Sequence, residues 1–146
     1  MQTKLKWMTI LRGRIFPRFS PGGVTFDDVK AGIENKNVTV IDVRNPEELT
    51  NTGKIPGAIN VPLPSIKSAF ELSDSEFKER FGINKPTTED NSVIVHCDNS
   101  VIVHCLTGKR AASAIEILKG LGYLNLKLYS GSFSDWQKNN GPIEKL

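Results

Sequence analysis

Two short runs of apolar, β-branched residues lie at positions 38–41 and 101–103. Nearly every position in them is apolar, so they lack the strict alternation that marks a strand with one solvated face. Continuous runs of this kind are typical of strands buried on both faces of a parallel sheet. Similar but weaker runs predict further strands at residues 59–61 and 126–129.

Apolar residues three and four positions apart predict helices between these strands. In residues 111–119 the apolar side chains fall on one helix face. Thr25, followed three residues later by Asp28, resembles a capping box at a helix start. Further helices are expected at residues 25–35, from residue 45 onward, and at residues 65–72, 76–81 and 133–139. The alternation of strands and helices predicts an α/β sandwich around a mostly parallel central sheet.

The first 23 residues differ from the rest in composition. Residues 1–26 carry five of the 19 basic residues and none of the 16 acidic ones. Their apolar residues fall near helical spacing, and an arginine-rich, acid-free leader is typical of a mitochondrial transit peptide. A disordered basic arm is the alternative. Because prolines and glycines then break the pattern, we expect a leader at residues 1–23 and a single domain at residues 24–146.

The net charge of +3 comes from that leader, since the remaining 120 residues hold 14 basic and 16 acidic side chains, a net of −2. This balance does not favour a nucleic-acid partner. No apolar run is long enough to cross a membrane, so no membrane partner is expected. The two cysteines do not form a secreted disulfide framework and indicate a reducing compartment, mitochondrial or alternatively cytoplasmic.

The sequence NSVIVHC occurs twice, at residues 91–97 and 99–105, with Asp98 between the copies. Only the second copy runs into a basic loop that contains glycine, so we expect it to form the central strand. The first copy is expected to form an extra edge segment or a long loop. The reverse assignment is possible locally, but it would leave Cys97 beside Asp98, whose charge opposes a thiolate.

A candidate reactive site therefore lies at Cys105-Leu106-Thr107-Gly108-Lys109-Arg110, between a strand and a helix. Backbone N–H groups and the positive end of a helix dipole favour an anionic sulfur there, and Lys109 and Arg110 lower the thiol pKa further. Gly108 lets the backbone fold tightly around the sulfur or around an anion bound to it. The alternative is a buried structural cysteine; the order of strand, cysteine, glycine, cations and helix favours function.

Four segments, taken in order, resemble the signatures of the rhodanese (sulfurtransferase) family. They are residues 40–44 with 46–48, residues 53–63, residues 105–110, and residues 121–123 with 131–136. The resemblance covers about residues 24–142, one rhodanese module. The chain departs from the pattern in its duplication, in Lys54 where histidine is usual, and in Ser132 in place of the second glycine of a common pair.

The resemblance implies a three-layer rhodanese fold and a persulfide relay. Cys105 would attack the outer sulfur of thiosulfate or of a persulfide donor, and glutathione, thioredoxin or cyanide would then accept the sulfur. The amides of residues 106–110 would cradle the persulfide, with Lys109 and Arg110 attracting the donor and Thr107 donating a hydroxyl hydrogen bond. No metal or other cofactor is expected.

Polar residues at the ends of the two central strands have either a functional or a structural role. Asp42 and Arg44 either shape the rim of the pocket or form a structural pair that anchors the loops, and we favour the pair. His104 points away from Cys105 on an ideal strand, which favours a satisfied core histidine over a catalytic base. Trp136 is expected to serve packing.

Two other functions compete with sulfur transfer. Cysteine-dependent phosphatases also use a His-Cys loop, and some share this fold, but their loop needs Cys-x5-Arg whereas this chain has Cys-x4-Arg. The shorter loop suits a sulfur atom better than a phosphate. The second alternative is a non-catalytic rhodanese-like module that carries sulfur or binds a partner. Many partner-binding modules of this fold have lost the cysteine, which this chain retains. A redox role in which Cys97 resolves Cys105 requires Cα atoms within about 7 Å.

Overall fold

The computed structural model describes residues 8–11, 14–17, 24–36, 38–86, 88, 100–123 and 125–146. Its centre is a four-stranded sheet in the order β4-β3-β5-β6, and all three of its ladders are parallel. The strands are β3 (Val38–Asp42), β4 (Ile59–Asn60), β5 (Ser100–His104) and β6 (Leu126–Leu128). The two β-branched runs are thus neighbours at the centre, paired from Val38 with Ser100 to Asp42 with His104.

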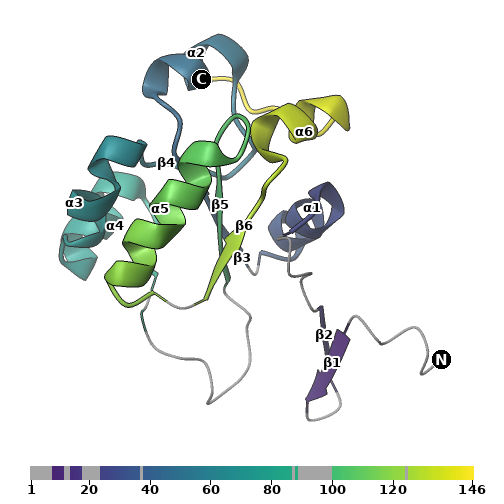
Figure 1. Cartoon of the computed structure of the whole chain (residues 1–146), viewed down its shortest axis with the longest axis horizontal. Helices are drawn as coiled ribbons and strands as arrows, with labels where there is room; N and C mark the ends of the chain where they lie inside the picture. The colour runs from purple at the N-terminus through teal and green to yellow at the C-terminus, as the bar shows by residue number, and fades with distance from the viewer. Residues whose placement is uncertain are drawn as a thin grey trace.

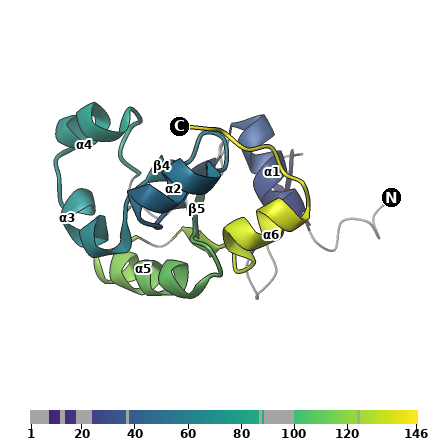
Figure 2. The same cartoon turned by 90° about the horizontal axis from the view of Figure 1, so that it is seen from above.

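Helices cover both faces of this sheet (Figures 1 and 2). The first face is covered by α3 (Ile66–Phe70), α4 (Asp74–Phe81) and α5 (Lys109–Gly120), and the second by α1 (Phe26–Asn35) and α6 (Ser132–Lys138). A short 3₁₀ turn, η2 (Leu63–Ser65), precedes α3, and α2 (Pro46–Thr52) follows β3. The chain therefore has the α/β architecture that the alternation of strands and helices predicts.

The central strands are buried on both faces, as their continuous apolar runs predict. Ile41 and Val103 pack into the core under α3, α4 and α5, and both are fully buried. Val40 and Ile102 point the opposite way, into the core under α1 and α6. Each such side chain contributes about 1.5–3 kcal/mol by leaving water, so burial on both faces stabilises these two strands.

Local signals set the starts of several helices. Thr25 accepts a hydrogen bond from the N–H of Asp28 at 3.2 Å, while its own N–H donates to the Asp28 carboxylate at 2.9 Å, so the predicted capping box is confirmed. Ser73 caps α4 in the same way. The helix after the cysteine loop begins at Lys109, two residues earlier than its apolar spacing predicts, because the first turn is polar.

The near-helical spacing at the N-terminus does not produce a helix among the described residues. Instead, β1 (Met8–Leu11) and β2 (Arg14–Pro17) form an antiparallel pair. The spacing is interrupted by charges, whereas isoleucine, threonine and phenylalanine favour strands. The first copy of the repeat, with Cys97, lies outside the described residues. No helix in the described part of the chain is long and apolar enough to cross a membrane.

Candidate active site

Cys105 occupies the junction between the central strand β5 and the helix α5. Figure 1 shows this junction at the end of the sheet where α2 also lies. This is the carboxyl edge of the parallel strands, where open α/β sheets bind their ligands. The cysteine is free and only 1% exposed, and the N–H of Gly108 donates to its Sγ over 3.0 Å.

Backbone amides set the electrostatics of this sulfur. Burial alone would raise the pKa of the Cys105 thiol, but hydrogen bonds from backbone N–H groups outweigh burial and hold the pKa below its usual value. These N–H groups belong to Ala111, Gly108, Thr107 and Arg110. The loop therefore favours the thiolate, the form in which a cysteine is a nucleophile.

Gly108 is required at its position for two reasons. Its φ of +103° lies in the left-handed region, which side-chain-bearing residues rarely adopt. A Cβ atom there would also lie 2.5 Å from the carbonyl oxygen of Ser130, closer than such atoms can approach. The glycine thus allows the loop to turn tightly enough for its N–H to reach Sγ.

The first turn of α6 holds the carbonyl side of the same loop. The N–H of Phe133 donates to the carbonyl oxygen of Cys105 at 2.9 Å, and the N–H of Ser134 donates to that of Leu106 at 3.0 Å. These two hydrogen bonds tie the loop backbone to α6, while the N–H groups on the sulfur come from the loop itself and from the first turn of α5. The loop is therefore held by both α5 and α6.

The other loop side chains lie in different environments. Leu106 packs against the core under α1 and α6, whereas Thr107 and Lys109 are exposed. Arg110 forms a bidentate ion pair with Glu48 of α2, with N···O distances of 2.7 and 2.9 Å. The hydrogen bond from Arg110 lowers the pKa of Glu48 to about 2. The pair joins the first turn of α5 to the first turn of α2.

Asp42 and Arg44 form a fully buried ion pair beneath the loop. The Arg44 side chain donates to both carboxylate oxygens of Asp42, the shortest contact being 2.7 Å. The same guanidinium donates to Thr52 Oγ1 and to the Gly53 carbonyl, each at 3.0 Å, and it lies 4.1 Å from the centre of the Phe133 ring. Arg44 therefore connects the end of β3 with the end of α2 and with α6.

His104 is fully buried on the opposite side of β5 from Cys105. Its Nδ1 lies 3.1 Å from the Cys105 carbonyl oxygen, and its Nε2 lies 3.6 Å from a carboxylate oxygen of Asp42. Burial lowers the pKa of the imidazole below its usual value, although the neighbouring Asp42 carboxylate acts in the opposite direction. His104 is a core histidine, but its Nε2 has no hydrogen-bond partner among the described residues. The expectation that its polar atoms are all hydrogen-bonded is therefore not met.

Two residues that sequence reasoning left out of the site contact it. Glu48 pairs with Arg110 across 62 positions, and no local signal in the sequence indicates that contact. Ser132, noted only as a substitution for glycine, lies with its Oγ 4.0 Å from Cys105 Sγ. Lys54, the other substitution, donates to the Ala58 carbonyl at 2.6 Å. Trp136 is buried and packs against Phe26, as predicted.

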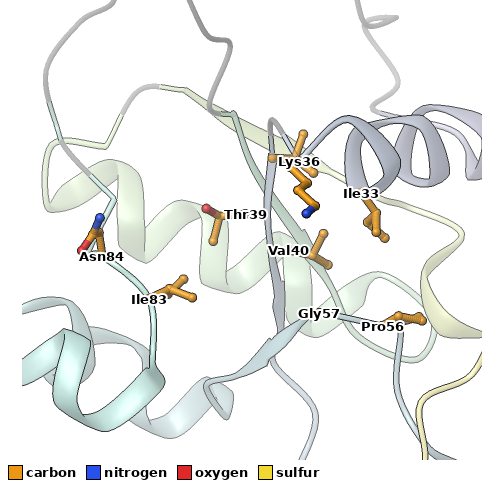
Figure 3. A pocket seen from close by; sticks show the side chains of 9 residues that line it. Ile33, Lys36, Thr39, Val40, Pro56, Gly57, Ile83 and Asn84 are labelled. Carbon is orange, nitrogen blue, oxygen red and sulfur yellow. The ribbon is translucent and has the colours of Figure 1, made fainter.

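Two surface cavities lie away from the cysteine. One of about 350 Å³ lies between the end of α1, the outer edge of β3 and residues 83–84 (Figure 3). The other, of about 480 Å³, lies beside β4 and the end of α4. Neither is lined by residues 105–110, so neither is the candidate active site. Within the described ranges, no three His, Cys, Asp or Glu side chains are grouped so as to hold a metal ion.

Comparisons with known proteins agree with this geometry. Residues 25–139 match the rhodanese-like domain model. Two relatives from Saccharomyces cerevisiae are thiosulfate:glutathione sulfurtransferase, 36% identical over 80% of this chain and 78% of the relative, and mitochondrial thiosulfate sulfurtransferase RDL2, 33% identical over 88% and 80%. The structure of human single-domain sulfurtransferase TSTD1 superimposes with a TM-score of 0.70 at 26% identity, covering 82% of this chain and 97% of the human one. The chain belongs to the rhodanese-like domain family of sulfurtransferases.

Proposed function

We propose that this protein transfers sulfane sulfur from thiosulfate or a persulfide donor to a thiol or cyanide acceptor, with Cys105 as the sulfur carrier. The observation that carries the proposal is the amide cradle around Sγ, in which the Gly108 N–H lies 3.0 Å from the sulfur. Such a cradle stabilises negative charge on the cysteine sulfur or on one further sulfur bound to it.

In the first step, the Cys105 thiolate attacks the outer sulfur of thiosulfate. A new S–S bond forms to Sγ, the bond between the two donor sulfurs breaks, and sulfite leaves with its electron pair. Cys105 then carries a persulfide whose outer sulfur holds the negative charge. The lowered pKa of the thiol supplies the thiolate that this step requires.

In the second step, the acceptor attacks the outer sulfur of the persulfide. A thiolate acceptor forms a new persulfide, cyanide forms thiocyanate, and the electron pair of the broken bond returns to Cys105 Sγ. The relay splits one difficult transfer into two displacements at sulfur. Neither displacement needs a proton donor, so the relay does not require His104. The imidazole of His104 is buried on the other side of the strand.

The charges around the loop divide into two roles. Lys109 is exposed at the start of α5 and attracts the dianionic donor. Arg110 is neutralised by its ion pair with Glu48, so its main contribution is to hold the loop, and its backbone N–H faces the sulfur. Thr107 is exposed and donates its hydroxyl to the donor. Asp42 and Arg44 serve as the buried anchor beneath the loop rather than as substrate ligands.

The relatives support particular partners and a location. Glutathione is the acceptor named for one yeast relative, and the mitochondrion is the location named for the other. Together with the acid-free, basic composition of residues 1–26, this supports glutathione as the acceptor, with thioredoxin as a second thiol, and import by a leader at residues 1–23. A cytoplasmic protein with a basic arm is the alternative.

The proposal is tested by assaying one preparation on two substrates. Thiosulfate with cyanide or glutathione should be turned over, and an aryl phosphate should not, because the Cys-x4-Arg loop is one residue shorter than a phosphatase loop. Cys105→Ser should abolish sulfur transfer. Turnover of the phosphate without turnover of thiosulfate would refute the proposal, and transfer by the serine variant would remove Cys105 from the mechanism.

A further inference from the structure

Ser132 has an unusual backbone conformation for a residue that is not glycine. Its φ is +54°, in the left-handed region, where a side chain costs about 1–2 kcal/mol. The residue is fully buried at the start of α6. A side chain retained at such a position, where glycine would be unstrained, suggests that the hydroxyl itself is used.

The hydroxyl replaces a hydrogen bond of the central sheet. Between β5 and β6, the N–H of Val101 donates to the Asn125 carbonyl and the N–H of Tyr129 donates to the Val103 carbonyl, both at 3.0 Å. The next bond of this parallel pattern would join the N–H of Cys105 to the Tyr129 carbonyl.

Ser132 Oγ lies between these two groups. It accepts from the Cys105 N–H at 3.1 Å and donates to the Tyr129 carbonyl at 2.8 Å. A glycine at this position offers no atom for this bridge. The hydroxyl therefore bridges the backbone of Cys105 to the end of β6, where the Tyr129 carbonyl also accepts from the N–H of Ser132 at 3.0 Å.

The same oxygen also lies 4.0 Å from Cys105 Sγ. A hydroxyl has one proton, so it donates either to the carbonyl or to the sulfur. The shorter contact favours the carbonyl while the sulfur is uncharged. A negative charge on Sγ strengthens the second contact, because hydrogen bonds to charged acceptors are about twice as strong as neutral ones.

We propose that Ser132 is a positioning residue that holds the backbone of Cys105 through its hydroxyl and donates that hydroxyl to Sγ whenever the sulfur carries the negative charge. The part that concerns catalysis rests on the proposed sulfur transfer. When the acceptor attacks the outer sulfur, the old S–S bond breaks and its electron pair stays on Sγ. Ser132 stabilises the departing thiolate in that step.

The first test measures the thiolate directly and does not depend on sulfur transfer. In a Cys97→Ser background, Cys105 is the one remaining cysteine of the chain, so its alkylation by iodoacetamide can be followed against pH. We expect Ser132→Gly and Ser132→Ala to raise the pH at which the alkylation rate reaches half its maximum, the alkylation midpoint, by about 0.5–1 pH unit. Ser113→Ala, which alters an exposed serine of α5, should leave the midpoint unchanged.

Comparison of the two variants separates the effect of the hydroxyl on the thiolate from its effect on stability. Glycine relieves the strain at φ +54°, whereas alanine retains it, so Ser132→Gly should have the higher melting temperature of the two. The midpoint should nevertheless rise in both. If melting temperatures change while both midpoints stay at the wild-type value, the hydroxyl has only a structural role and the proposal is overturned.

A second readout addresses the reaction. Discharge of a preformed Cys105 persulfide by glutathione should slow about 3–10-fold in both variants. Wild-type rates of discharge in both would overturn the catalytic part. If the wild-type protein transfers no sulfur at all but the alkylation midpoints still shift, the proposed function fails while the contact of Ser132 with the thiolate stands.

Discussion

The ion pair between Glu48 and Arg110 gives a prediction whose size follows from the structure. Glu48→Gln removes the charge but keeps the shape of the side chain and one oxygen that accepts hydrogen bonds. The pKa of Glu48 falls from 4.5 to about 2 in the folded protein, chiefly because Arg110 donates to it. Taken at full value, this shift corresponds to about 3.4 kcal/mol.

Solvent reduces that figure. The two side chains are 30% and 34% exposed, and screened pairs of this kind contribute less than their pKa shifts suggest. We therefore expect Glu48→Gln to lower the free energy of unfolding by about 1–2 kcal/mol at pH 7. Glu47→Gln is the matched control: Glu47 lies in the same first turn of α2 and is exposed, so the change should cost no more than about 0.5 kcal/mol.

The dependence on pH distinguishes the charge from the shape of the side chain. Because the pKa of Glu48 is lower in the folded state, its stabilisation is complete above about pH 4.5 and is lost as the pH falls toward 2. Urea unfolding at pH 7 and near pH 2 should therefore show a difference between wild type and Glu48→Gln that shrinks in acid. A difference that is absent at pH 7, or equal at both pH values, would refute this reasoning.

Three further predictions concern the site. Gly108→Ala should lower thiosulfate turnover at least about 10-fold, because the new Cβ would meet the Ser130 carbonyl. Gly82→Ala is the control: its φ is also positive but its surroundings are open, so turnover should not fall. Equal activities of the two variants would contradict the role assigned to Gly108. Asp42→Asn leaves the Arg44 guanidinium buried without its counter-charge and should lower the free energy of unfolding by about 3–5 kcal/mol in urea; a change below about 1 kcal/mol would argue against the anchor. Cys97→Ser should leave sulfur transfer unchanged in steady-state assays, and a loss of activity would implicate the first copy of the repeat.

The sequence predicts most of the fold because its signals are local. Continuous apolar runs identify β3 and β5, and the capping box at Thr25 marks the start of α1. The strand–cysteine–glycine–helix order places the cysteine correctly at the carboxyl edge of the sheet. These patterns depend on neighbours within a few positions, which is why they can be recognised without coordinates.

The remaining features depend on contacts between distant segments. Nothing near Glu48 in the sequence indicates that it pairs with Arg110 rather than with solvent, since only the packing of α2 beside α5 brings them together. The role of the Ser132 hydroxyl depends on where the β5–β6 ladder ends. At the N-terminus the local signal itself was misleading. The apolar residues there have a weak helical spacing, but residues that favour strands prevail and β1 pairs with β2.

The central claim, that Cys105 carries the transferred sulfur, is tested most directly by mass spectrometry after a single treatment with thiosulfate. Cleavage before Asp98 places Cys97 and Cys105 on different fragments. We expect a gain of about 32 Da, one sulfur atom, on the fragment with Cys105, and reversal of that gain by glutathione. A gain on the fragment with Cys97, or no gain on either fragment, would contradict the persulfide at Cys105.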